Sequence, residues 1–240
     1  MKKLLLAAVV VAISAGSAWA QTVRMGTEGA YEPYNFVNDK GEIDGFEREL
    51  GDKLCSMAGY TCEWVKNDWD SIIPNLTSGN YDTIMAGMSI TDERKEKIDF
   101  TQAYFPPTAS AYVALKGASD DVISGNVAAQ VNTIQAGYIA ESKATLVEFA
   151  IADETVAAVR NGEADAVFAD KDYLQKIVDE SNGELTFIGP DVPLGGGVGM
   201  GLRKSDAEMR DKFDAAISQM KGDGSLNVLI EKWFNMKNAF

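Results

Sequence analysis

One unit of sequence occurs twice in this chain, and this repetition limits the possible folds more than any other feature. The segments IPNLTSGNYDTIMAG, from Ile73, and VAAVRNGEADAVFAD, from Val156, align without gaps at an offset of 83 residues. Each reads as a helix, a glycine that ends the helix, a short turn and an apolar strand. Two equivalent units predict two similar lobes. Two unrelated helix–turn–strand units can also align in this way by chance.

Short apolar strands and amphipathic helices alternate outside the repeat as well. The segment VRMGT, from Val23, reads as a strand, GFERELGDKLCSMAG as a helix with one apolar face, and TCEWV as a further strand. Such alternation predicts an α/β fold with largely parallel sheets flanked by helices.

The repeat aligns Gly87 with Asp170, and both lie where an apolar strand stops. Ligands of open α/β sheets bind outside the carboxyl ends of the strands. If the two lobes face each other, these strand ends form opposite walls of a cleft. Arg94 follows shortly after the first end, so a guanidinium and a carboxylate could hold a small zwitterion between them.

Arg94 is placed unfavourably for a residue that serves only its own helix. The preceding residues, 91–93, read as a helix start, where an arginine opposes the helix dipole at a cost of some tenths of a kcal/mol. A bidentate contact with a ligand carboxylate would explain it. The alternative is a solvated helix face, because Glu93 and Lys97 are spaced for an ordinary surface ion pair.

The first 20 residues, MKKLLLAAVVVAISAGSAWA, have the form of a secretory signal peptide cleaved after Ala20. The apolar run is too short to span a bilayer. No cysteine follows it, so we expect no lipid anchor. The mature chain is therefore predicted to be exported and soluble.

The only cysteines, Cys55 and Cys62, are seven residues apart in the exported part of the chain. In an oxidising compartment this pair predicts one disulfide. The alternative is two reduced thiols in the core. Metal binding would need further ligands, and we expect no metal and no cofactor.

Composition excludes several classes of function. The chain has no histidine, which removes Ser-His-Asp and Cys-His nucleophiles and zinc sites that need imidazole. Its formal charge is -14, and -16 without Lys2 and Lys3. This acidity disfavours a nucleic-acid or anionic-membrane partner.

Several segments share their order and spacing with a known family. They are TEGAYEPYNF, GEIDGFERELGDKLC, DWDSIIPNLTSGNYDTIMAGMSITDERKEKIDFTQAYF, GEADAVFAD and GVGMGLRK. Together they resemble the periplasmic polar amino-acid binding proteins of importers driven by ATP-binding cassettes, which are solute-binding proteins of family 3. Cys55 and Cys62 match the disulfide of the branch that binds histidine and basic amino acids.

The resemblance implies two lobes joined by two crossover strands that close over one ligand. We expect a signal peptide over residues 1–20, lobe 1 over 21–108 and 192–240, and lobe 2 over 109–191. The crossovers are expected near 106–112 and 187–192.

Matching positions give each site residue an implied role. Arg94 matches the clamp of the ligand α-carboxylate, and Asp170 matches the acceptor of its α-ammonium. Tyr31 matches an aromatic wall, and Glu28 an acid that meets the distal cation of basic ligands. Trp69 falls where a residue covers the ligand, able to stack on a guanidinium or an aliphatic stem.

In the second lobe, QVNTIQAGY resembles a family pattern that opens a helix, so Thr133 and the amides around it would meet the carboxylate. The complete set of expected ligand-binding residues is Glu28, Tyr31, Trp69, Ala86, Gly87, Met88, Ser89, Arg94, Gln130, Thr133, Ile134 and Asp170.

The chain departs from the family pattern near the carboxylate. Ala86 and Gly87 stand where two serines are usual, and Ile134 replaces a hydroxyl residue, while Asn132 replaces a glycine. Backbone amides at Gly87 and Ser89 are expected to donate instead. The missing side chains leave room for a substituted amino acid, such as an opine.

Each assignment has a purely structural alternative. Tyr31 and Trp69 could be core aromatics, and Glu28 could only cap the next turn. Asp170 could be the N-cap of the helix that starts near Lys171, where aspartate is favoured.

The predicted function is capture of a basic amino acid of the arginine, lysine or ornithine type by hinge closure. The protein would be a monomer that delivers its ligand to the membrane permease of an importer, and not an enzyme. Two alternatives remain open: an opine-like ligand, or a periplasmic dehydratase on the same fold, for which Glu28 is the unassigned acid or base.

Overall fold

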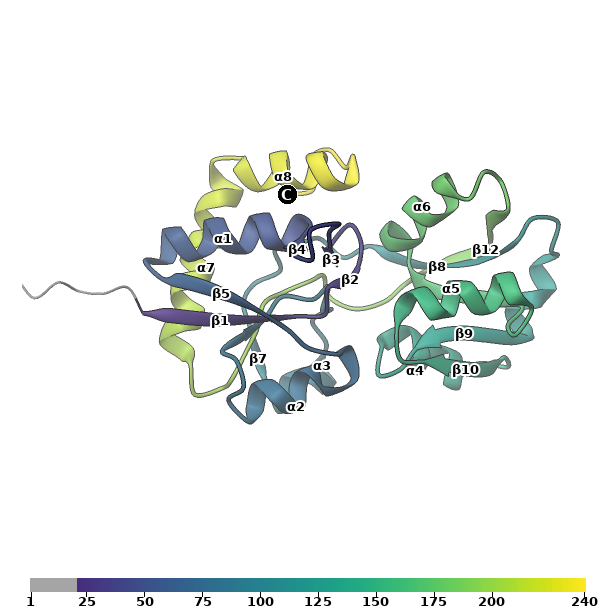
Figure 1. Ribbon diagram of the computed structural model, residues 1–240, viewed down its shortest axis with the longest axis horizontal. Coiled ribbons are helices and arrows are strands. Elements are labelled where there is room, and N and C mark those ends of the chain that lie inside the picture. Colours follow the sequence, from purple (N-terminus) through teal and green to yellow (C-terminus); the bar gives the residue numbers. More distant parts are fainter. Residues whose placement is uncertain (1–20) are drawn as a thin grey trace, which may run out of the picture.

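The computed structural model describes residues 21–240. The predicted signal peptide, residues 1–20, lies outside the described residues. Two five-stranded sheets form the centres of two lobes, which lie side by side in Figure 1. We call the part built on the first sheet lobe 1 and the part built on the second sheet lobe 2.

Lobe 1 has the strand order β5-β1-β6-β13-β7. Its strands are β1 (Thr22–Thr27), β5 (Thr61–Lys66), β6 (Thr83–Ile84), β7 (Asp99–Phe100) and β13 (Gly201–Leu202). Its helices are α1 (Phe46–Ala58), the 3-10 helix η1 (Trp69–Ser71), α2 (Ile72–Thr77), α3 (Asp92–Lys97), α7 (Ala207–Gly222) and α8 (Ser225–Phe234). A small antiparallel sheet adds β2 (Ala30–Tyr31), β3 (Asn35–Val37) and β4 (Ile43–Asp44).

Lobe 2 has the strand order β10-β9-β11-β8-β12. Its strands are β8 (Ala109–Leu115), β9 (Asn126–Gln130), β10 (Thr145–Phe149), β11 (Ala166–Asp170) and β12 (Leu185–Pro193). Its helices are the 3-10 helix η2 (Asp120–Ser124), α4 (Ile134–Ala140), α5 (Ala152–Asn161) and α6 (Lys171–Glu180).

The two main sheets have the same topology. In lobe 1, β5, β1 and β6 run parallel, and β13 and β7 complete the sheet through antiparallel pairings. In lobe 2, β10, β9 and β11 run parallel, and β8 and β12 are added in the same antiparallel way. The two-lobed α/β prediction is therefore confirmed.

The repeated units form the same local structure in both lobes. Gly79 follows α2 with φ 81°, and Gly162 follows α5 with φ 75°. Both are left-handed conformations, which glycine adopts without a steric penalty. Each glycine ends its helix and turns the chain into the central strand that points towards the other lobe, β6 or β11.

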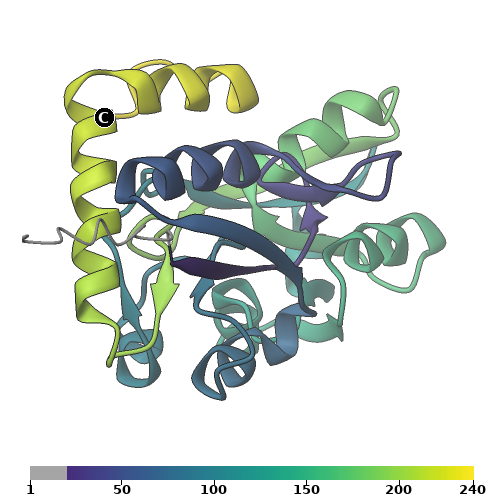
Figure 2. The same ribbon diagram turned by 60° about the vertical axis from the view of Figure 1, so that its left-hand side comes forward.

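Helix α1 shows how the apolar pattern positions an element. Its buried residues Phe46, Leu50 and Leu54 recur at the helical spacing. They belong to one apolar cluster with Val23 and Met25 of β1. Figures 1 and 2 show α7 and α8 beside α1, so lobe 1 includes the carboxyl-terminal helices.

The predicted disulfide is present between Cys55 and Cys62, whose Cα atoms are 6.1 Å apart. It joins the last turn of α1 to the second residue of β5. The bond therefore ties the helix to the outer strand of lobe 1.

The chain passes between the lobes along two paired segments. After a bulge between Ile188 and Val192, β12 pairs with β8 again, Val192 with Ser110 and Pro193 with Ala109. On the lobe 1 side, Phe105 bridges to Val198. The chain therefore crosses between the lobes twice, between Phe105 and Ala109 and between Pro193 and Val198.

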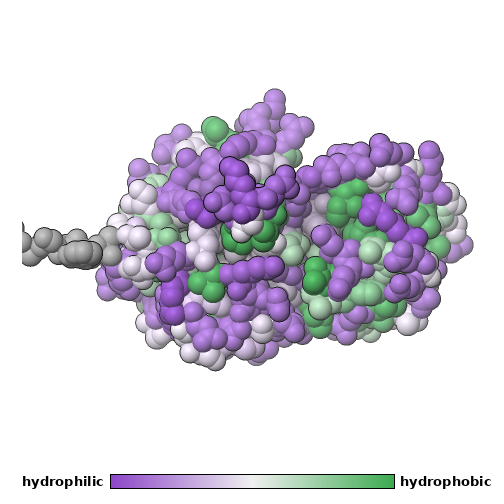
Figure 3. Space-filling model, viewed as in Figure 1, coloured by the Kyte–Doolittle hydropathy of each residue, from purple (hydrophilic) through white to green (hydrophobic). Residues whose placement is uncertain are grey.

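Within residues 21–240, no helix combines the length and the apolar character that crossing a bilayer requires. Figure 3 shows a largely hydrophilic face on which apolar residues appear around the boundary between the lobes.

Candidate functional site

The ends of four strands meet at one cavity between the lobes. Glu28 directly follows β1 and Ala86 lies just beyond β6, while Gln130 ends β9 and Asp170 ends β11. Each group of parallel strands presents its carboxyl ends at one edge of its sheet. The cavity measures about 20 Å³, which is room for about one water molecule.

The cavity brings together most of the predicted residues. Its lining consists of Glu28, Tyr31, Trp69, Ala86, Gly87, Ser89, Arg94, Gln130, Thr133, Ile134, Gln135 and Asp170. From the predicted set only Met88 is missing, because it is buried in the core of lobe 1 and lines an adjoining groove instead. Gln135 was not predicted.

Arg94 is a buried cation in the first turn of α3. The hydroxyl of Thr91 caps this helix by accepting a hydrogen bond of 3.1 Å from the Arg94 amide. The guanidinium donates to the carbonyl oxygens of Ser89, at 2.9 Å, and of Asn132 in lobe 2, at 3.3 Å. The alternative of a solvated helix face does not hold for Arg94, because the residue is only 9% exposed.

The charge of Arg94 is retained although its side chain is buried. Burial lowers the pKa of Arg94 to about 10, with the negative charge of Asp170 acting in the opposite direction. No carboxylate of residues 21–240 forms an ion pair with it. Two of its five N–H groups bind carbonyl oxygens, so donors remain for an anion.

Trp69 covers Arg94. The centre of its ring lies 5.3 Å from the Arg94 guanidinium carbon, within the range of a cation–π contact. Trp69 was expected to stack on a ligand guanidinium or stem, and in this structure its ring stacks on the arginine of the protein.

Asp170 is held by hydrogen bonds from both lobes. Its Oδ2 accepts from the hydroxyl of Tyr31 at 2.8 Å, and its Oδ1 accepts from Nε2 of Gln135 at 2.8 Å. Asp170 occupies the N-cap position of α6, as the structural alternative expected, but its side chain makes no cap hydrogen bond. Burial raises its pKa to about 6, against the effects of Tyr31 and Arg94.

Glu28 is the second carboxylate of the cavity, and it is buried. Its Oε1 accepts from Nε2 of Gln130 at 2.6 Å, which is a contact between the lobes rather than a cap of the next turn. Burial raises the pKa of Glu28 to about 7, and the nearby charges of Asp68 and Asp153 contribute in the same direction.

Tyr31 is both a lobe contact and a cavity wall. Its ring stacks on Tyr173 of lobe 2 with centroids 4.2 Å apart. The hydroxyl bond to Asp170 fixes the ring beside the cavity. The core alternative is therefore partly correct, since Tyr31 packs in the core and also lines the site.

The hydroxyl of Thr133 is already engaged. It accepts from the amide of Ala136 as the N-cap of α4 and donates to the carbonyl oxygen of Gln130 at 2.7 Å. Any contact of Thr133 with an anion would therefore use backbone amides at the start of α4.

One expectation about the backbone is wrong. The Gly87 amide was expected to donate to a ligand, but it donates to Oε1 of Glu47 at 2.8 Å. Glu47 is a fully buried residue of α1 that sequence reasoning did not select. Gln135 was also missed, although its place in the first turn of α4, two residues after Thr133, was a usable signal.

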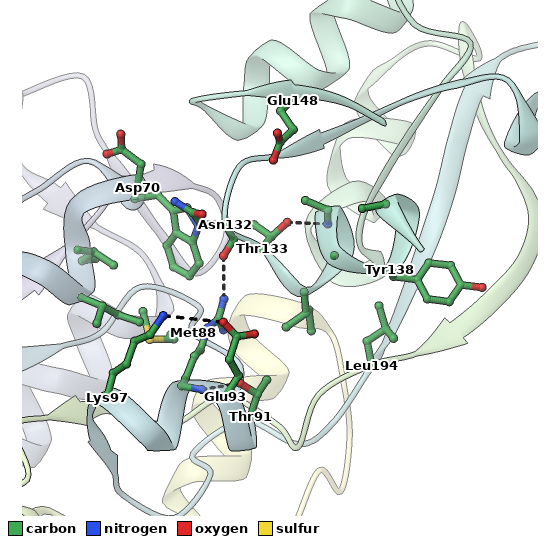
Figure 4. A pocket seen from close by; sticks show the side chains of 18 of the residues that line it. Asp70, Met88, Thr91, Glu93, Lys97, Asn132, Thr133, Tyr138, Glu148 and Leu194 are labelled. Atoms are coloured by element: carbon green, nitrogen blue, oxygen red, sulfur yellow. Dashed lines mark hydrogen bonds and ion pairs between the residues drawn. The ribbon is translucent and has the colours of Figure 1, made fainter. Parts of the chain in front are cut away.

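A groove of about 1100 Å³ adjoins the cavity and separates α2 and α3 of lobe 1 from α4 and β10 of lobe 2. Trp69 and Arg94 line both spaces. Figure 4 shows Asp70 and Glu148 on opposite sides of the groove and Lys97 beside Glu93. The groove offers room next to the Arg94 end of the site.

The charges at the cavity match those of one kind of solute. One end carries a buried cation, Arg94, and the remaining walls carry two carboxylates, the half-buried Asp170 and the buried Glu28. A solute with one negative and two positive groups matches this arrangement.

Comparison with known proteins places the chain in a family. The sequence model of bacterial extracellular solute-binding proteins, family 3, matches residues 23–236. The chain belongs to this family. A similar solved structure is the periplasmic His/Glu/Gln/Arg/opine family-binding protein from Silicibacter pomeroyi in complex with lysine. It is 75% identical, with a TM-score of 0.88, and the match covers 91% of this chain and 99% of that chain.

Two further relatives are similar to this family 3 protein over most of its length. The putative ABC transporter arginine-binding protein 2 of Escherichia coli strain K12 is 30% identical over 98% of this chain and 99% of its own length. The ancestral amino acid-binding protein AncCDT-1, a precursor of cyclohexadienyl dehydratase, is 31% identical with a TM-score of 0.80. The match covers 89% of this chain and 95% of that chain.

Proposed function

We propose that this protein captures a basic amino acid in the periplasm and delivers it to the permease of an ABC importer. The observation that carries the proposal is the meeting of Arg94, from lobe 1, and Asp170, from lobe 2, at one cavity between the lobes. Arg94 binds the α-carboxylate, Asp170 accepts from the α-ammonium, and Glu28 accepts from the distal cation. The lysine complex of the 75% identical relative supports this ligand class.

The energetics of three ionic contacts fit such a role. A charge-assisted hydrogen bond contributes about 1.5 to 3 kcal/mol. Micromolar affinity needs about 8 kcal/mol, which three such contacts approach before ordering costs are subtracted. Contacts of the ligand with Tyr31 and Trp69 then supply the remaining binding free energy.

Capture proceeds by hinge motion of the two lobes about the paired crossover strands. Only the closed form lets residues of both lobes contact one ligand, so the ligand stabilises closure. We assign residues 1–20 to a cleaved signal peptide, 21–108 and 192–240 to lobe 1, and 109–191 to lobe 2. The protein acts as a monomer and not as an enzyme.

The decisive experiment identifies the natural ligand directly. Protein is purified rapidly from the cells that make it, denatured, and the released small molecules are identified by mass spectrometry. Lysine, arginine or ornithine at a near-stoichiometric amount supports the proposal. A neutral or acidic ligand refutes the assignment of Glu28.

An opine-like ligand is a second candidate because of one specific observation. The groove of about 1100 Å³ adjoins the cavity at Arg94, Thr133 and Ile134. A substituent on the amino acid would have space there. Competition of bound lysine by an N-substituted arginine, compared with arginine itself, separates the two ligand classes.

Catalysis on the same scaffold is the third reading, since a dehydratase precursor shares the fold. Glu28 is the candidate acid or base. Incubating the protein with a panel of amino acids and recovering each one unchanged supports a pure binding role. Any altered product would overturn it.

A further inference from the structure

Glu47 lies outside the cavity, yet it is bonded to a loop that forms the cavity wall. It is the second residue of α1 and is fully buried. Its Oε1 accepts from the amide of Gly87 at 2.8 Å and from the hydroxyl of Tyr104, and its Oε2 accepts from Nδ2 of Asn35 at 2.7 Å. A carboxylate satisfies all three donors because both of its oxygens only accept.

Asn35 continues this chain of bonds to the other ligand loop of lobe 1. It is fully buried, and its Oδ1 accepts from the amide of Gly29 at 2.7 Å. Gly29 directly follows Glu28, the carboxylate proposed to meet the distal cation. Glu47 and Asn35 therefore connect the loop after β1 with the loop after β6.

The loop at Gly87 has little room to move. Gly87 has φ 61°, and a Cβ placed there would lie 3.3 Å from Cδ1 of Tyr31. The loop thus packs against the ring whose hydroxyl binds Asp170 at 2.8 Å. A shift of the Gly87 loop would reach the cavity both through its own backbone and through Tyr31.

We propose that Glu47 is a positioning residue that, through Gly87 and Asn35, holds two ligand loops of lobe 1 in their binding geometry. The inference rests on the proposed function, in which Glu28 and the Gly87 loop line the ligand site. Glu47 makes no contact with the ligand. Its role is to act as the common acceptor for groups that belong to separate loops.

The hydrogen-bond pattern allows a specific rescue. In Glu47→Gln, the new amide oxygen can still accept from Gly87 and Tyr104, but the new NH₂ faces the NH₂ of Asn35. Adding Asn35→Asp converts that donor into an acceptor, which can bind the new NH₂ and still accept from the amide of Gly29. The double variant exchanges the carboxylate and the amide between the two positions, keeps the net charge and restores an acceptor for each bond of the native network.

The chain also offers a matched control in the same lobe. Asp82 is a partly buried carboxylate that accepts from the amide and guanidinium of Arg24 and from Arg203. It precedes β6 and therefore lies at the end of the sheet opposite the cavity. Asp82→Asn tests whether any loss of a carboxylate in lobe 1 weakens binding.

The experiment measures the lysine Kd by isothermal titration calorimetry and the ligand-free Tm by circular dichroism for the full mature chain and its variants. Lysine binding by the unaltered protein tests the proposed function independently. We expect Glu47→Gln to raise Kd at least tenfold and Glu47→Gln/Asn35→Asp to return it to within threefold. Asp82→Asn should lower Tm and leave Kd within twofold.

Three results would overturn the inference: an unchanged Kd in Glu47→Gln, no recovery in the double variant, or an equal loss of affinity in Asp82→Asn. If Glu47→Gln does not fold, Asn35→Ala decides the question, because it removes the link to Gly29 and leaves the carboxylate in place. The inference then requires at least a threefold rise in Kd, and an unchanged Kd contradicts it.

Discussion

The two lobes share a scaffold and differ at its ends. Asp82 in lobe 1 accepts from the amide of Arg24 at 2.9 Å and donates its own amide to the Arg24 carbonyl at 2.8 Å. Asp165 in lobe 2 makes the same two bonds with Asn126, each at 2.7 Å. The aspartate of each repeat thus ties its strand to the neighbouring parallel strand by an equivalent pair of bonds.

The two lobes differ in the ion pairs of these aspartates and in the groups at the cavity end of each strand. Asp82 also pairs with the side chains of Arg24 and Arg203, at 2.9 and 3.0 Å, whereas Asp165 forms no ion pair within residues 21–240. At the cavity end, lobe 1 presents the backbone of Gly87, and lobe 2 presents the carboxylate of Asp170. A repeated backbone therefore supports two chemically different walls.

The largest effect is expected from removing the cationic wall. Arg94→Ala should abolish measurable binding of lysine, arginine and ornithine. Arg94 and the ligand α-carboxylate would form a buried ion pair, and loss of one partner of such a pair costs about 3 to 5 kcal/mol. That is more than about a hundredfold in affinity. Titration calorimetry measures it, with Lys95→Ala on the same helix as control, and unchanged affinity in Arg94→Ala would refute the clamp.

Removing the acidic wall should have the next largest effect. Asp170→Asn preserves size but loses a charge-assisted contact of about 1.5 to 3 kcal/mol with the ligand ammonium. Affinity for all α-amino acids should fall about tenfold to a hundredfold. Asp179→Asn, on the exposed side of α6, which follows Asp170, is the control for titrations with lysine. Equal affinities of the two variants would contradict the assignment of Asp170.

Glu28→Gln should change selectivity rather than overall affinity. The new side chain can still accept from Gln130, so only the charge is removed. The affinity for lysine and arginine should fall more than tenfold, and the affinity for neutral ligands such as glutamine should stay the same. Because burial raises the pKa of Glu28 to about 7, lysine affinity of the unaltered protein should fall between pH 8 and pH 6.

The fall in lysine affinity between pH 8 and pH 6 that comes from Glu28 should be absent in Glu28→Gln when the titrations are repeated across this range. Equal losses for cationic and neutral ligands would show that Glu28 is a structural residue.

The smallest effects concern stability and compare the two repeats directly. Asp82→Asn leaves two arginines without their carboxylate and should cost about 1.5 to 3 kcal/mol of unfolding free energy. Asp165→Asn, at an exposed residue, should cost less than about 1 kcal/mol. Urea unfolding of the ligand-free proteins measures both, and similar losses would contradict the contrast between the lobes.

Acid titration sharpens the same comparison. Burial alone would raise the pKa of Asp82, but hydrogen bonds from Arg24 and Arg203 lower it to about 2. A folded pKa below the unfolded value of about 3.9 contributes stability above pH 4, which is lost as the pH falls towards 2. Asp82→Asn should lose less stability than the unaltered protein over this interval.

Local patterns were sufficient for much of the fold and for the chemistry of the site. The gapless alignment of the repeats predicted two lobes, because glycine stops and apolar strands are encoded by neighbouring residues. Arg94 and Asp170 were found from strand ends and charge, and the resemblance to the family added Glu28, Tyr31 and Trp69.

The missed features depend on partners that are distant in the chain. Gly87 was expected to offer its amide to a ligand, but Glu47, 40 residues away, already accepts from it. Thr133 is a local exception, because its hydroxyl caps α4 at Ala136 and donates to the carbonyl oxygen of Gln130, each three residues away. Gln135 acquired its place beside Asp170 only through the packing of α4 against β11.

The order of residues alone settled which elements form, where helices stop and which charges stand at strand ends, because these depend on neighbours within a few positions. Folding settled which donors and acceptors remain for a ligand. A hydrogen bond made inside the protein removes its groups from the site, and those bonds join residues that lie far apart in the chain and meet only in three dimensions.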